Sequence, residues 1–227
     1  MTKRIARRST NTVKSESFRR KMRTISILES YQIPTNEYLP ELPSSRNIVP
    51  RTINDIAHRA MCLTLMGAKG EDLEQNHVDR YILKYNLKNY LSDSELLFLS
   101  DPDPSDEDRC SANWRYEGAY VMLWALGHMA LELPFSTCPT PEVAERVIAF
   151  DEMISEASPR SIGELLNQAD IAYRCHWAAV NQSISSNTSD ETDNFIIDIG
   201  VCYQRRLALE WLIGGPDLDW DDVRTDT

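Results

Sequence analysis

The feature that most constrains this chain is its apolar periodicity, which is helical along almost its whole length. Phe18, Met22, Ile25 and Leu28 recur three or four residues apart, the spacing that places side chains on one face of an α-helix. Comparable runs follow along the chain, and no segment alternates apolar and polar residues between hairpin turns as a strand would. The sequence therefore predicts a single all-α domain of about seven or eight helices.

One of these segments is apolar on every side. The stretch from Gly118 to Leu131 holds 14 residues without a charge, too few for a transmembrane helix. A helix that is apolar all round belongs in the middle of a bundle. We therefore expect a central apolar helix over residues 118–133, ending before Pro134.

Local signals place several other boundaries. Four prolines within residues 32–51 prevent regular structure and predict an extended segment over the surface. Ser92 with Glu95, and Ser161 with Glu164, have the spacing of capping boxes, which begin helices.

Charge divides the chain into three parts. Residues 1–23 carry nine basic side chains and one acid, a net +8, so the other 204 residues carry −19 of the overall −11. We predict a basic flexible N-terminal arm over 1–14, the domain over 15–216, and an acidic tail over 217–227 packed on or near it. The basic run is a frayed terminus, the polar side of a first helix, or a nucleic-acid-binding arm.

Acidic residues form two clusters in the sequence. One lies in the middle of the chain and the other in the tail; their members are Asp101, Asp103, Asp106, Glu107, Asp108, Asp217, Asp219, Asp221 and Asp222. They are either solvated loops or a negative face that steers a basic partner. Trp220, between tail aspartates, either staples the tail to the domain or offers an exposed anchor for that partner.

Catalytic and cofactor motifs are absent from the sequence. It contains no nucleotide-binding glycine loop, no G-x-S-x-G and no H-E-x-x-H, and its four histidines lack ligand spacing. We expect no metal, no cofactor and no assignable catalytic residue. Five cysteines without a close pair indicate reduced thiols and a cytoplasmic location.

Several charged residues lie within apolar helical segments. They are Arg59, Arg115, Glu117, Arg174, His176, Arg205 and Arg206. Unpaired buried charge is costly, so these side chains must find partners. One hypothesis is a structural Arg–Glu–His network, and the other is a cationic pocket for a phosphate or carboxylate ligand.

The chain resembles a bacterial family known only as domain of unknown function (DUF) 4272. The likeness rests on W-R-Y-E from Trp114, L-W-A-L-G ending at Gly127, the last helix with its twin arginine, and a terminal W-D-D-V from Trp220. The resemblance implies an all-α soluble protein without an assigned reaction, of a kind associated with immunity-type proteins encoded near toxins. The family pattern has a glutamate before the twin arginine, whereas this chain has Gln204.

Two functions remain open at this point. The first is a non-catalytic acidic module that binds a protein, such as an immunity protein neutralising a basic toxin domain. The second is an enzyme or small-anion-binding protein built on the Arg/Glu/His residues. A solvent-free ion network favours the first, and an open pocket lined by these residues favours the second.

Overall fold

The computed structural model describes residues 14–186 and 197–226, and every regular element within them is helical. The predicted all-α fold is therefore confirmed, but the described residues form ten α-helices rather than the seven or eight that the sequence predicts. The α-helices are α1 (Glu16–Ser30), α2 (Ile53–Gly70), α3 (Gln75–Lys84), α4 (Asp93–Ser100), α5 (Asp106–Asn113), α6 (Arg115–Ala125), α7 (Thr140–Ile148), α8 (Phe150–Ser155), α9 (Ile162–Ser186) and α10 (Ile199–Ile213). Two short 3₁₀ turns, η1 (Ser45–Asn47) and η2 (Leu87–Asn89), join them.

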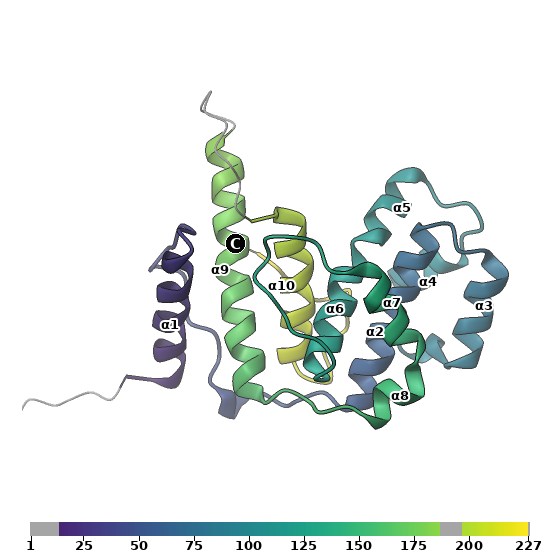
Figure 1. The fold of residues 1–227 in the computed structure, drawn as a ribbon, viewed down its shortest axis with the longest axis horizontal. Helices are drawn as coiled ribbons and strands as arrows, with labels where there is room; N and C mark the ends of the chain where they lie inside the picture. The colour runs from purple at the N-terminus through teal and green to yellow at the C-terminus, as the bar shows by residue number, and fades with distance from the viewer. Residues whose placement is uncertain (1–13, 187–196, 227) are drawn as a thin grey trace, which may run out of the picture.

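The long helices form a row. Helix α1 packs on α9, α9 on α10, α10 on α6, and α6 on α2. Helices α3, α4 and α5 lie beyond α2, so α1 and α3 occupy opposite ends of the longest axis of the molecule (Figure 1). None of the described helices is long and apolar enough to cross a membrane.

The central helix is shorter than the sequence predicts. Helix α6 is buried along its length, as expected, but it begins at Arg115 and ends at Ala125. Gly127 has a φ of 88°, and the His128 amide donates to the Leu123 carbonyl at 2.9 Å. This is a Schellman ending, in which a left-handed glycine stops the helix. Residues 126–133 of the predicted range are therefore not part of the helix, because the left-handed turn at Gly127 outweighs the apolar run.

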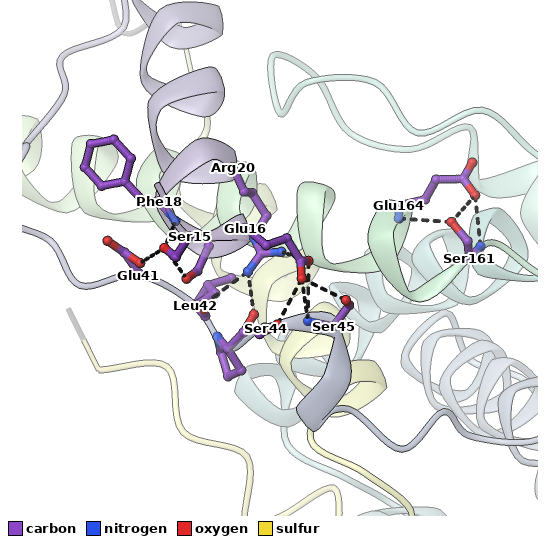
Figure 2. Close-up of polar contacts among 12 residues, drawn as sticks. Ser15, Glu16, Phe18, Arg20, Glu41, Leu42, Ser44, Ser45, Ser161 and Glu164 are labelled. Carbon is purple, nitrogen blue, oxygen red and sulfur yellow. Dashed lines mark hydrogen bonds and ion pairs between the residues drawn. The ribbon is translucent and has the colours of Figure 1, made fainter. Parts of the chain in front are cut away.

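The extended segment 32–51 is held against α1 by side chains of the first turns of that helix (Figure 2). Glu16 accepts hydrogen bonds from the hydroxyls of Ser44 and Ser45, at 2.9 and 2.8 Å, which lower the pKa of Glu16. The buried Arg20 donates to the carbonyls of Leu42 and Pro43. Prolines deprive this segment of amide donors, and side chains of α1 satisfy its carbonyls instead.

The predicted capping boxes are confirmed. The Ser161 amide donates to Glu164 at 2.9 Å while the Glu164 amide donates to the Ser161 hydroxyl, as Figure 2 shows. Ser92 and Glu95 make the same reciprocal pair at the start of α4. These local contacts fix where α4 and α9 begin.

The acidic C-terminal segment lies against the domain. Trp220 is 4% exposed, and its ring meets the ring of Trp211 edge to face at 6.0 Å. Arg51 donates to the carbonyls of Trp211 and Leu218, at 2.9 and 2.7 Å. Trp220 therefore staples this segment to α10, and the alternative of an exposed anchor for a partner is wrong. The predicted basic arm lies outside the described residues except for Lys14.

Candidate functional site

Glu117 and Arg205 form a buried ion pair between α6 and α10. Glu117 is 2% exposed and Arg205 is 5% exposed. Arg205 Nε donates to Glu117 Oε2 at 2.8 Å, and the Cys138 amide donates to Oε1 at 2.6 Å. The other Arg205 nitrogens bind the carbonyls of Glu132 and Ser136, each at 3.0 Å. The pair thus joins two central helices to the loop after α6.

Arg59 of α2 finds its partner in α4. Its Nη1 donates to both carboxylate oxygens of Glu95, at 2.7 and 2.8 Å, and Glu95 is fully buried. The same carboxylate accepts the Ser92 amide in the capping box. Glu95 therefore both begins α4 and neutralises an arginine, a role that its capping spacing alone did not reveal.

Arg174 pairs along its own helix. It binds both oxygens of Asp170, one turn earlier in α9, at 3.0 and 3.2 Å. The Arg174 side chain is 1% exposed, and it also donates to the Pro40 carbonyl of the extended segment at 3.2 Å. This i,i+4 spacing was visible in the sequence and could have identified Asp170 as the partner.

Arg206 binds the backbone of the acidic C-terminal segment. It donates to the carbonyls of Thr225 and Asp226, at 2.8 and 2.7 Å, and to His176 Nδ1 at 2.9 Å. Glu210, one turn later in α10, lies 3.7 Å away. Burial, together with the nearby Arg206 charge, lowers the pKa of His176 to about 4, so its ring is neutral at pH 7.

The charged residues singled out in the sequence are therefore not one site. They are divided among separate pairs whose partners, apart from Glu117 with Arg205 and His176 with Arg206, were not among them. Arg115 is half-buried, and its charge helps to lower the pKa of Asp221. They form separate contacts rather than one connected Arg–Glu–His network, because Arg59, Arg174 and Arg205 lie on three different helices.

Only part of this set borders open space. Arg205 lines a cavity of about 20 Å³, room for one water molecule. Arg59 borders a larger cleft of about 330 Å³ beside the C-terminal segment, lined also by Arg51, Asp217, Asp219 and Trp220. Arg51 already binds three carbonyls there, and its guanidinium lies 3.5 Å from the centre of the Trp211 ring. The arginines of this cleft thus hold the protein together and face aspartates, which disfavours an anionic ligand.

One residue of each acidic cluster lies at an end of α4. Asp101 is the C-cap of α4, and the Ser94 amide at its other end donates to Asp221 at 3.0 Å. Burial raises the pKa of Asp221, but hydrogen bonds, chiefly from Ser94, lower this pKa by more, so it lies below its ordinary value. A helix of eight residues is about 12 Å long. The tertiary structure therefore brings together two segments more than a hundred residues apart in sequence.

An apolar side chain lies between these two acidic groups. Leu97 of α4 is 76% exposed. Asp93, Leu97 and Ser100 are spaced by four and three residues, so they share the solvent-facing side of α4. We call the exposed residues of this region the α4 acidic surface; they are Asp93, Leu97, Asp101, Asp103, Asp106, Glu107, Asp108, Asp221 and Asp222.

Side-chain contacts from α2 and α5 hold the α4–α5 loop of this surface in place. Lys69 is 3% exposed, and its ammonium donates to the Leu99 carbonyl at 3.0 Å and to the Asp101 carbonyl. Arg109 pairs with Asp103 and with Asp72 of the neighbouring α2–α3 turn. The carboxylates are therefore displayed by an anchored loop, which lowers the entropy lost on binding.

The described residues contain no group of His, Cys, Asp and Glu side chains that could hold a metal ion. All five cysteines are free, and four of them are buried. Burial raises the pKa of Cys62, Cys138 and Cys175 to about 12, so these thiols are protonated and unreactive at neutral pH.

The chain matches the model of a protein family. The model of a family described as domain of unknown function (DUF4272) matches residues 20–223, nearly the whole chain. No curated protein and no solved structure matches the chain.

Proposed function

The chain belongs to the DUF4272 family, and because that family carries no assigned activity, we propose from its surface that it is a non-catalytic module that binds a basic protein. The observation that carries the proposal is the α4 acidic surface, where residues of two acidic clusters lie on either side of the exposed Leu97. An exposed apolar residue surrounded by charge has the layout of a binding surface, with an apolar anchor inside a polar rim.

The electrostatics of this surface favour a basic partner. Its carboxylates belong to a chain of net charge −11. Arg59 and Lys69, the cations beneath α4, are buried and already bound to Glu95 and to carbonyls. The negative field therefore faces outward, where it accelerates association with a positively charged protein. A basic toxin domain neutralised by this chain acting as its immunity protein is the specific case that we propose.

The buried ion pairs support a structural role for the other charged residues. Glu117, Arg174 and Arg205 have little exposed surface and are bound within the domain. A ligand would have to break these pairs to reach them. We therefore assign them to stability and place the function on the surface.

Photo-crosslinking tests the proposal. Leu97 is replaced by a photo-crosslinking amino acid in the full chain, and the matched control carries the same amino acid at Tyr38, which is 86% exposed and lies in the extended segment beside α1. We expect position 97, and not position 38, to form an adduct with a basic protein in the cells that make the chain.

Charge neutralisation then tests the electrostatic part. The variant Asp93→Asn/Asp106→Asn/Glu107→Gln/Asp222→Asn changes four exposed carboxylates of the surface. The adduct at position 97 should be lost, and affinity for the purified partner should fall with rising salt in the wild type. An adduct that persists in this variant, or crosslinking at both positions alike, would refute the proposal.

A further inference from the structure

A groove between α2, α3 and α7 joins an apolar half to an acidic half. The apolar half has a volume of about 110 Å³ and is lined by Met61, Leu65, Leu73, Tyr81 and Ile148. The acidic half, of about 440 Å³, is lined by Glu71, Asp72, Glu74 and His77. Ala68 and Leu73 line both halves, so the two halves adjoin.

The apolar half has the features of an unfilled site. Ile148 at its rim is 50% exposed. Thr64, which also lines it, is 5% exposed, and its hydroxyl has no hydrogen-bond partner. Buried hydroxyls are usually satisfied. A cavity of about 150 Å³ lined by aliphatic side chains can take up benzene, so this smaller pocket suits one aliphatic side chain.

The acidic half attracts cations. Three carboxylates and one histidine line it, and no lysine or arginine is among the lining residues. Arg109 approaches from outside and links Asp72 to Asp103 of the α4 acidic surface. The complementary ligand is a peptide segment that carries an aliphatic side chain next to basic ones.

The chain itself contains such a segment. Residues 1–14 carry five basic side chains and no acid, and Ile5 lies between Arg4 and Arg7-Arg8. This segment leads into α1, which lies at the opposite end of the longest axis from α3 (Figure 1). The start of α1 therefore lies at the opposite end of the molecule from α3, which favours docking between molecules.

We propose that the arm of one copy, residues 1–14, docks in this groove of a second copy. Ile5 fills the apolar half, and Arg7 and Arg8 lie against Glu71 and Glu74 in the acidic half. Because each copy uses one end as donor and the other as acceptor, the contact is heterologous and produces open chains or rings. This proposal does not depend on the external partner proposed above.

Sedimentation velocity on the full chain tests the proposal. At about 20 mM salt, where charges are weakly screened, we expect the mean mass to rise with concentration above that of a monomer, and at about 500 mM salt to return to that of a monomer. The variants Ile5→Asp and Ile148→Asp should each be monomeric at both salt concentrations. The control Leu83→Asp, at an 84% exposed position on α3 that does not line the groove, should behave as the wild type.

A peptide experiment separates the apolar contact from charge. A labelled peptide of residues 1–14 is added to the Ile5→Asp chain, whose own arm is disabled and whose groove is free. Replacing Ile5 by Ser in the peptide should weaken its binding about ten-fold or more, as expected for the loss of one buried aliphatic side chain. A circular dichroism melt confirms that Ile148→Asp is folded.

Three results would overturn the inference. A wild type that is monomeric at low salt has no docking between copies. Association that survives Ile148→Asp in a folded protein lies elsewhere on the surface. Peptide binding that is equal with and without Ile5 reflects charge alone.

Discussion

Replacing Glu117 with glutamine removes one charge from the centre of the molecule and keeps the shape of the side chain. Glu117 uses its two oxygens for two donors, Arg205 Nε at 2.8 Å and the Cys138 amide at 2.6 Å. Glutamine has a single oxygen, so its amino group must face one of these donors. The substitution therefore removes the counter-charge of a buried arginine and leaves one buried donor unmatched.

The expected cost follows from these contacts. Breaking a buried ion pair by removing one partner costs about 3–5 kcal/mol. Arg205 keeps its bonds to the Glu132 and Ser136 carbonyls, which places the cost near the lower end, about 3 kcal/mol. For a chain of this length, that loss lowers the melting temperature by about 6–12 °C.

Urea unfolding of wild type and Glu117→Gln at pH 7 measures the difference. The matched control is Glu142→Gln, an exposed first-turn glutamate of α7 that should cost less than about 1 kcal/mol. In a cycle with Arg205→Met, the two sites should show a coupling of at least about 1 kcal/mol. A loss for Glu117→Gln no larger than that of the control, or additive effects in the cycle, would refute the assignment of a buried pair.

Three further predictions concern pH, packing and thiols. In the folded protein the pKa of His176 is lowered to about 4 from its ordinary value of 6.5. The unfolded chain therefore takes up the proton first, and the stability that the neutral ring contributes is lost as pH falls from 6.5 toward 4. His176→Gln should flatten the pH dependence of urea midpoints over that range. Gly67→Ala would place a Cβ 2.5 Å from the Tyr116 ring and should cost about 1–3 kcal/mol in a chemical melt. Ellman's reagent should titrate one thiol, the exposed Cys110, in the native protein and all five in denaturant; rapid reaction of a second native thiol would contradict the buried assignments.

The starts of α4 and α9 could be predicted because they depend on neighbouring residues. The capping boxes at Ser92 and Ser161 need only a side chain and an amide three residues away. The end of α6 was not predicted from the apolar pattern. The apolar run continues through residues 126–131, but the left-handed Gly127, whose added Cβ would meet the Ser158 carbonyl at 2.4 Å, turns the chain away.

The pairing of charges was only partly predictable. That Glu117 and the arginines need partners follows from their apolar surroundings. Asp170 could have been found for Arg174 from its i,i+4 spacing, whereas Glu95 reaches Arg59 only because α4 packs beside α2. Sequence distance carries no information about a contact between helices whose packing is not yet known.

The sequence by itself determined the helical class, the starts of α4 and α9 and the presence of two acidic clusters, because these depend on periodicity, local hydrogen bonds and composition. Only the tertiary structure decided that a residue of each cluster lies at an end of α4, on either side of Leu97, and that Trp220 is buried against Trp211. The physical reason is that helix packing depends on how whole apolar faces fit together. The surfaces proposed for a basic partner and for the arm of a second copy arise from that packing and are encoded in no single segment.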